Sequence, residues 1–205
     1  MNASMLCQLS VETENLTDGS NDLLARAQGG DGEAFNLIFV SHHRFIYKFI
    51  YAMVGEQSLA EELTQETFLG AYRGICSLRG ESKLRTWLCG IAKNTVYKFL
   101  RSQRREGTKS ADAVESFDLV DERNLPPDEE FLSRELNQRI EAALAGLDAD
   151  KRLIFVLKEL QQLSYHEISE ITGHSIPKLK TDLHRAKARM QIVLRPYLEV
   201  SDELL

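Results

Sequence analysis

SYHEISEITGHSIPKLKTDLHRAKARM, residues 164–190, is the stretch that decides the fold. Its first part predicts a short helix, because Ser164 can cap an N-terminus with Glu167 three residues further on. Gly173 then permits a tight turn, and a second helix follows on which apolar residues recur in steps of three and four. Two helices joined by such a turn are typical of a helix-turn-helix, whose second helix lies in the major groove of DNA.

The second helix carries candidate DNA contacts on the faces that its apolar stripe leaves free. Pro177 is compatible with this helix because it falls in the first turn, where a missing N–H costs nothing. The alternative is an ordinary basic surface helix in a helical bundle, since charged solvated faces are common. The pattern by itself leaves both interpretations open. The polar and basic candidates are Lys178, Lys180, Thr181, His184, Arg185 and Lys187.

The charge of the chain is unevenly distributed. The 205 residues carry a formal net charge of −6, which is unusual for a protein that binds nucleic acid alone. Residues 73–109 nevertheless hold ten Lys and Arg against two Glu, and residues 174–195 hold six against Asp182. Residues 110–150 hold twelve acidic side chains against three Arg. Screening limits charge effects to about 10 Å, so a phosphate backbone would meet two separate basic segments.

The remaining sequence predicts an all-α protein, because apolar residues keep helical spacing and no segment has the pattern of a strand. We expect two small helical domains joined by an acidic flexible linker, the C-terminal one containing the helix-turn-helix. The expected organisation is a disordered tail at 1–20, a helical domain at 21–106, the linker at 107–132, a second domain at 133–198 and a tail at 199–205.

Capping residues predict where several helices begin and end. Asp31 can cap a long helix that ends near Gly55, and Ser58, with Glu61 three residues later, is expected to cap the next. A further helix is expected after a break at 77–82. In the second domain the apolar positions are Leu136, Ile140, Leu144 and Leu147, followed by Leu153, Leu157 and Leu160.

Two more segments offer binding surfaces. AEELTQETF, residues 60–68, has an acidic face that is either a solvated helix surface or a docking surface for a basic partner. TWLCGIAKNTVYKFLRSQRR, residues 86–105, mixes cations with aromatic rings, a combination that suits a partly melted DNA strand. Trp87 and Phe99 fall on the apolar stripe and are assigned to the core. The residues off that stripe remain candidates: Lys93, Asn94 and Tyr97.

Catalytic, metal and redox chemistry find little support in the sequence. Cys7, Cys76 and Cys89 form no CxxC pair, so free reduced thiols are expected, with redox or metal control as the alternative. No phosphate-cradling glycine loop, nucleophile elbow or metal-ligand spacing is present. No apolar run is long enough to span a membrane, and the N-terminus lacks the pattern of a signal peptide, so we expect a cytoplasmic location.

The chain contains, in this order, AEELTQETFLGAYR, RGESKLRTWLCGIAKNT, and LSYHEISEITG followed by KLKTDLHRAKARM. This combination of segments resembles a bacterial extracytoplasmic-function (ECF) sigma factor. The resemblance covers residues 22–106 and 133–195. It implies a specificity subunit with no catalytic residues, cofactor or metal of its own. The implied partners are core RNA polymerase, through its β′ clamp helices and β flap, promoter DNA and an anti-sigma factor. The acidic linker resembles the connector that threads the polymerase cleft towards the RNA exit channel.

The resemblance also implies site residues. Asp182 departs from the family pattern, and its carboxylate should repel nearby phosphates. Residues matching the polymerase-docking segment are Glu61, Glu62, Gln65, Glu66 and Phe68. Residues matching the segment that opens the −10 element, where a flipped base enters a pocket, are Leu78, Arg79, Gly80, Glu81, Ser82, Lys83, Lys93, Asn94 and Tyr97. Residues matching the −35 reader are Lys178, Lys180, Thr181, His184 and Arg185.

Two other functions are compatible with parts of the chain. A stand-alone helix-turn-helix regulator would bind its promoter without polymerase, and such regulators usually carry a receiver or ligand-binding domain in front. The helical, aromatic-rich N-terminal half resembles neither. An enzyme of nucleic-acid metabolism would need one of the catalytic motifs that the sequence lacks.

Overall fold

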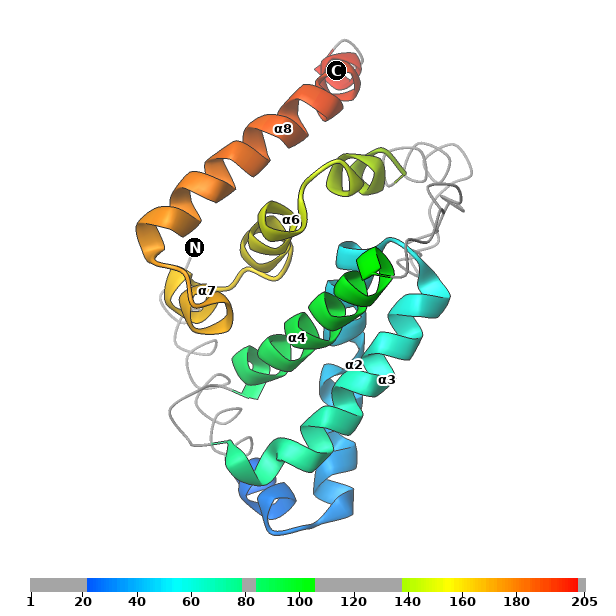
Figure 1. Cartoon of the computed structure of the whole chain (residues 1–205), viewed down its shortest axis with the longest axis vertical. Coiled ribbons are helices and arrows are strands. Elements are labelled where there is room, and N and C mark those ends of the chain that lie inside the picture. Colours follow the sequence, from blue (N-terminus) through cyan, green and yellow to red (C-terminus); the bar gives the residue numbers. More distant parts are fainter. Residues whose placement is uncertain (1–21, 79–83, 106–137, 203–205) are drawn as a thin grey trace, which may run out of the picture.

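The computed structural model describes residues 22–78, 84–105 and 138–202, and the regular structure in these ranges is entirely helical (Figure 1). The prediction of an all-α fold is therefore confirmed. The expected tail at 1–20, the linker at 107–132 and residues 79–83 of the predicted −10 loop lie outside the described residues. We call residues 22–105 the N-terminal half and residues 138–202 the C-terminal half.

The helices fall into these two halves in chain order. The N-terminal half has a helix at 22–28, α2 (Gly32–Val54), α3 (Gln57–Gly74), the short 3₁₀ helix η1 (Ile75–Ser77) and α4 (Leu84–Arg105). The C-terminal half has a helix at 138–145, α6 (Ala149–Phe155), the π-helical turn η2 (Val156–Leu160), α7 (Tyr165–Thr172) and α8 (Ile176–Asp202).

Local capping chemistry sets most helix ends as expected. The Asp31 carboxylate accepts from the backbone N–H groups of Glu33 and Ala34 at the start of α2, and Gly55 ends that helix with a left-handed φ of 76°. Ser164 and Glu167 form a reciprocal capping box at the start of α7. These caps satisfy backbone N–H groups that would otherwise lack helical partners.

One predicted cap is wrong. Helix α3 begins at Gln57 with Glu56 as its N-cap, and the Glu56 carboxylate accepts from the Leu59 N–H. Ser58 lies inside the first turn, where its hydroxyl donates to the same Glu56 carboxylate. N-cap positions usually hold a shorter side chain such as Ser, Thr, Asp or Asn. Here the longer Glu56 side chain makes the capping hydrogen bond, so α3 begins before Ser58.

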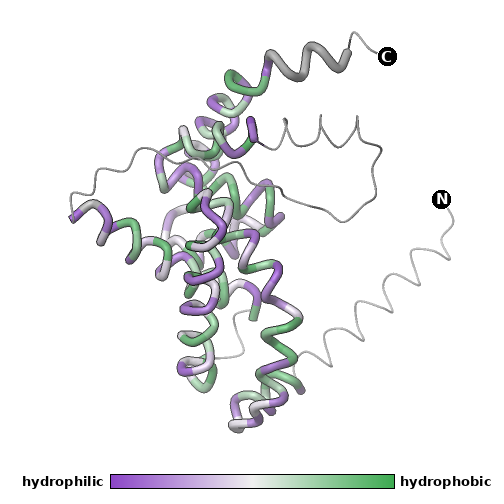
Figure 2. Tube along the Cα trace, turned by 90° about the vertical axis from the view of Figure 1, so that its right-hand side faces the viewer, coloured by the Kyte–Doolittle hydropathy of each residue, from purple (hydrophilic) through white to green (hydrophobic). Residues whose placement is uncertain are grey.

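Helix α4 lies at the centre of the molecule, with α2 and α3 on one side and α7 on the other (Figure 1). On the first side, Leu88, Ala92 and Val96 are fully buried against a core that includes Phe49 and Leu63. Figure 2 shows hydrophobic and hydrophilic residues alternating along the helices, as expected of amphipathic helices. Among the described residues, no helix is both long and apolar enough to span a bilayer.

The C-terminal half folds around its helix-turn-helix. Ile168 and Ile171 of α7 are buried, and Gly173 makes the turn with a left-handed φ of 73°. Helix α8 packs on α6 and α7. Its buried residues recur at helical spacing and leave the opposite face exposed: Leu179, Leu183, Ala186 and Met190.

The π-helical turn η2 changes the register that the sequence predicts. The Gln161 N–H donates to Val156 O at 2.9 Å, a bond over five residues, which turns Gln161 inward to 7% exposed. Leu160, expected on the apolar stripe, is instead 47% exposed. Gln162 then adopts φ 56°, the only positive φ at a non-glycine among the described residues.

The two halves pack against each other, with α6 and η2 contacting α2. The Arg152 guanidinium of α6 donates to Met53 O at the end of α2, at 2.7 Å, and to Ala145 O, also at 2.7 Å. The Tyr51 hydroxyl donates to Glu141 at 2.9 Å. Tyr51 is 2% exposed although it lies off the predicted stripe of α2, because the C-terminal half covers it.

Replacing Gln162 by glycine should stabilise the protein. The exposed Gln162 side chain contributes little packing, whereas its left-handed backbone is strained for any residue with a Cβ. We expect Gln162→Gly to raise the free energy of unfolding by about 0.5–1 kcal/mol, measured by urea denaturation. Gln162→Ala is the matched control, because it keeps the Cβ and the strain. Equal midpoints for the two variants would contradict this explanation.

Candidate functional site

Helix α8 presents the predicted −35 residues together on its exposed face. The buried stripe on the opposite side fixes the orientation of the helix, so these side chains point to solvent. Thr181 donates to Pro177 O in its own helix at 3.0 Å, and the Lys180 ammonium lies 5.6 Å from the centre of the Tyr165 ring. All five predicted residues are exposed: Lys178, Lys180, Thr181, His184 and Arg185.

Asp182 forms an ion pair on this face. Its carboxylate accepts from the Lys178 ammonium at 2.6 Å, and the Asp182 side chain is only 14% exposed. The pair neutralises one cation of the set, because the two residues lie one helical turn apart. Lys187 makes a second ion pair, with Glu159 at 2.9 Å. The other two cations of the predicted set, Lys180 and Arg185, form no ion pair with the described residues.

The predicted −10 residues of α4 face the C-terminal half. Lys93 donates to Ile171 O of α7 at 2.7 Å, and burial lowers the pKa of its ammonium. The Tyr97 hydroxyl donates to Asp150 of α6 at 2.7 Å. Burial, followed by this hydrogen bond, raises the pKa of Tyr97 above its ordinary value. Asn94 between them is exposed.

The start of the predicted −10 loop is anchored from the N-terminal helix. The Gln28 amide donates to Ile75 O at 3.1 Å and to Leu78 O at 2.7 Å. Leu78 itself is buried. The other predicted residues of this loop lie outside the described residues: Arg79, Gly80, Glu81, Ser82 and Lys83.

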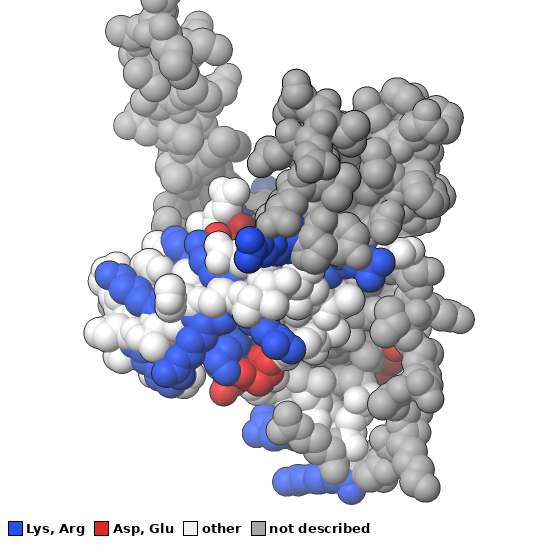
Figure 3. Space-filling model, turned by 90° about the horizontal axis from the view of Figure 1, so that it is seen from above, with Lys and Arg blue, Asp and Glu red and all other residues white. Residues whose placement is uncertain are grey.

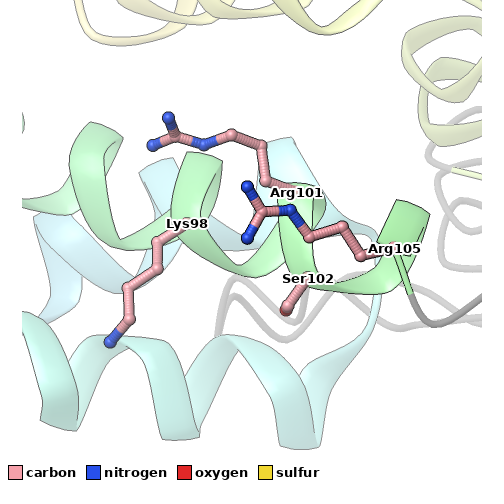
Figure 4. Close-up of a pocket in the computed structure, with 4 residues that line it drawn as sticks. All are labelled: Lys98, Arg101, Ser102 and Arg105. Atoms are coloured by element: carbon pink, nitrogen blue, oxygen red, sulfur yellow. The ribbon is translucent and has the colours of Figure 1, made fainter.

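The last turns of α4 form a basic cradle whose residues are not among the predicted site residues. Lys98, Arg101, Ser102 and Arg105 line a shallow pocket there. Figure 4 shows the Arg101 and Arg105 side chains running along α4 in the same direction while Lys98 extends towards α3. Lys98 pairs with Glu66 at 2.9 Å. Figure 3, which views the molecule from above, shows many Lys and Arg side chains and few Asp and Glu side chains among the described residues.

An exposed apolar groove runs between α2 and α3 beside the predicted docking residues. Phe39 and Phe68 meet edge-to-face at 4.8 Å between ring centres, and Phe35 meets Tyr72 at 5.0 Å. Phe68, a predicted docking residue, is 4% exposed and lines the groove. Leu69 and Tyr72, each 57% exposed, were missed because they lie off the apolar stripe. We call Phe35, Phe39, Gln65, Phe68, Leu69 and Tyr72 the α2–α3 groove.

The acidic docking residues border this groove. Glu61, Glu62, Gln65 and Glu66 are all exposed on α3. Glu61 accepts from the Gln57 amide at 3.0 Å, and Glu66 is held by Lys98. An apolar floor with a charged border is typical of a protein-binding surface. The structure thus brings four of the five predicted docking residues to one exposed surface.

Sequence comparisons identify relatives of this chain. The family model of Sigma-70 region 2 matches residues 38–106, and the model of Sigma-70, region 4 matches residues 137–190. ECF RNA polymerase sigma-E factors of Salmonella typhimurium and Escherichia coli strain K12 are 32% identical over 191 residues, covering 91% of this chain and 98% of theirs. The same factor of Haemophilus influenzae is 32% identical over 194 residues, covering 90% and 99%.

The chain belongs to the ECF sigma factors of RNA polymerase. Solved structures share its fold. A sigma factor RpoE bound to the anti-sigma factor NepR, from Bartonella quintana, matches with a TM-score of 0.66 at 24% identity, over 78% of this chain and 96% of that one. CnrH, in complex with the cytosolic domain of CnrY, matches with a TM-score of 0.65 at 19% identity, over 86% and 97%.

As an ECF sigma factor, the protein gives RNA polymerase its promoter specificity. Its two described cysteines are free thiols, with Cys76 exposed and Cys89 buried. Burial raises the pKa of Cys89 to about 12, so this thiol is unreactive in the folded sigma factor. Among the described residues, no group of three or more His, Cys, Asp and Glu side chains could hold a metal ion.

Replacing Asp182 by asparagine should strengthen DNA binding by the sigma factor. The change removes a carboxylate from the −35 face and frees the Lys178 ammonium for a phosphate. We expect about three- to tenfold tighter binding to a fluorescent duplex at low salt, with a salt slope steeper by about one. The same change in a Lys178→Gln background should have a clearly smaller effect. Equal gains in both backgrounds would show that the ion pair is not the cause.

Proposed function

We propose that this sigma factor consists of domains at 21–106 and 133–198. Three separate surfaces on them bind core polymerase, open the −10 element and read the −35 element. The α2–α3 groove and its acidic border bind core polymerase at the β′ clamp helices. Helix α4 and the 78–83 loop open the −10 element, and the exposed face of α8 reads the −35 element. The protein contributes no active site, cofactor or metal; the polymerase supplies the chemistry. It acts in the cytoplasm, where the polymerase and the promoter are.

The arrangement of α8 is the observation that carries this proposal. One side of the helix is buried against α6 and α7, so the packing of the C-terminal half dictates which residues face solvent. The residues that the family pattern assigns to base reading are among the exposed ones. A helix docked in the major groove needs this division between a fixed buried side and a polar reading side.

An anti-sigma factor is the expected regulator. The sigma factor RpoE named above was solved in complex with the anti-sigma factor NepR, and this chain shares its fold. The α2–α3 groove offers such a partner an exposed apolar surface with acidic residues beside it. A regulator that covers the groove would compete directly with core polymerase, which needs the same surface.

Alanine at Lys180 or Arg185 should weaken −35 recognition. The test is reconstitution with core polymerase and run-off transcription on genomic fragments, which also identifies the promoters. We expect each lost base contact to cost about 1–3 kcal/mol, or about five- to 150-fold in promoter affinity. Lys48→Ala, which removes an exposed cation from α2, is the control. The role of α8 is excluded if both α8 variants transcribe as the control does.

Tyr72→Ala should weaken polymerase binding at every promoter. Tyr72 is an exposed aromatic residue at the edge of the groove, and such residues often dominate binding energy. We expect a loss of about 2 kcal/mol, or about 30-fold, in affinity for core polymerase measured by competition. Ile192→Ala is matched, because Ile192 is 68% exposed on α8, away from the groove. Equal affinities for the two variants would exclude the groove as the docking site.

A further inference from the structure

Tyr165 holds a fixed position close to α8. It is the first residue of α7 and directly follows Ser164, whose capping box with Glu167 fixes the start of that helix. The Tyr165 side chain is half-buried and packs against the hydrophobic core. Because its backbone and its ring are both held in place, Tyr165 offers a rigid aromatic surface to its neighbours.

Two lysine side chains place their ammonium groups near this ring. The Lys158 ammonium of η2 lies 4.9 Å from the centre of the Tyr165 ring, and the Lys180 ammonium of α8 lies 5.6 Å from it. Both distances fall within the range of about 6 Å over which an aromatic ring attracts a cation. Lys158 also donates to Leu163 O at 3.0 Å, so the main chain holds this ammonium as well.

The Lys180 side chain is held differently from the other cations around it. It is exposed and forms no ion pair with the described residues, whereas Lys178 on the same helix is paired with Asp182. Its ammonium contacts the Tyr165 ring instead. The fixed Lys158 ammonium disfavours conformations in which Lys180 moves closer to it, because like charges repel. The ring and this repulsion together restrict the directions that the Lys180 side chain can take.

We propose that Tyr165 is a positioning residue for −35 recognition, which holds the Lys180 ammonium in the arrangement that reads its base. The proposal rests on the proposed function for the role of Lys180. A lysine side chain is long and flexible, and ordering it on DNA costs conformational entropy. A side chain that a ring already holds loses less entropy on binding and reaches fewer base edges. Tyr165 thus contributes to affinity and to promoter specificity through Lys180, without reading a base itself.

The contact between the ring and Lys180 can be observed in the free chain by NMR. Protons that lie over an aromatic ring give signals displaced upfield by the ring current. In the full chain labelled with ¹³C-lysine, the terminal methylene signal of Lys180 is identified by its loss in Lys180→Ala. We expect this signal to be displaced upfield in the wild type and in Tyr165→Phe, which keeps the ring, but not in Tyr165→Leu. A signal without displacement in the wild type would overturn the proposal.

Promoter discrimination is the functional readout. Core polymerase carrying each variant is tested on a promoter mapped by run-off transcription and on its single-base substitutions in the −35 element. Lys180→Ala identifies the base pair whose discrimination depends on Lys180. We expect Tyr165→Leu to lower discrimination at this base pair about two- to fivefold, as the loss of an exposed cation–π contact implies, and to leave the other positions unchanged. Tyr165→Phe should discriminate as the wild type does.

A double-mutant cycle separates positioning from a purely structural role. In a Lys180→Ala background, Tyr165→Leu should have no further effect, because no ammonium is left for the ring to hold. In the matched Lys178→Ala background its full effect should remain, because Lys178 is paired with Asp182 rather than with the ring. A loss that persists without Lys180, or an equal loss at every −35 position, would show that Tyr165 only supports the fold and would overturn the proposal.

Failure of the proposed function gives a different result from failure of the positioning role. If Lys180→Ala changes discrimination at no −35 base pair, the reading role of α8 is refuted, and the positioning role with it. If Lys180→Ala has its expected effect while Tyr165→Leu discriminates as the wild type does, the positioning role alone is refuted. Thermal midpoints of the Tyr165 variants, measured on the full chain, show that the comparison is made between folded proteins.

Discussion

Burial of α4 on two sides is the constraint on which the rest of the structure depends. One side meets α2 and α3 through aliphatic residues such as Leu88 and Val96, which exclude water completely. The other side meets α6 and α7 through Thr86, Lys93 and Tyr97, whose polar ends all find acceptors across the boundary. The same helix thus packs through aliphatic residues on one face and adds polar contacts to the apolar packing on the other.

The two faces of α4 differ in how the free energy of their contacts responds to water. An apolar face loses free energy in proportion to the area it exposes, so α4 stays with α2 and α3. A face whose contacts are hydrogen bonds recovers most of that energy from water when it separates. Arg152 illustrates the point, because its guanidinium bonds the end of α2 while also bonding Ala145 O within its own half. Its position in the C-terminal half does not depend on the contact with α2.

The sequence predicts correctly those features that depend on interactions between residues a few positions apart. Asp31 and the Ser164–Glu167 box were predicted because a cap involves only its own helix turn. The features it missed depend on distant neighbours or on backbone detail. Tyr51 is buried and donates to a glutamate 90 residues away in the sequence. The π-helical turn buries Gln161 and exposes Leu160, and the sequence carries no signal of it. Likewise, the spacing rule identified Lys93 and Tyr97 but gave no indication of their partners in the C-terminal half.

The distribution of charge bears on why DNA binding by such a chain depends on a larger assembly. A net charge of −6 gives the isolated protein little long-range attraction to DNA, although α8 and the end of α4 are locally basic. Within the predicted −35 set, Lys178 is already paired with Asp182, which lowers the local field further. Affinity must then come from several surfaces engaged at once, because linked weak contacts reinforce each other only when geometry lets them act together. A polymerase that holds both halves apart on one promoter would supply that geometry.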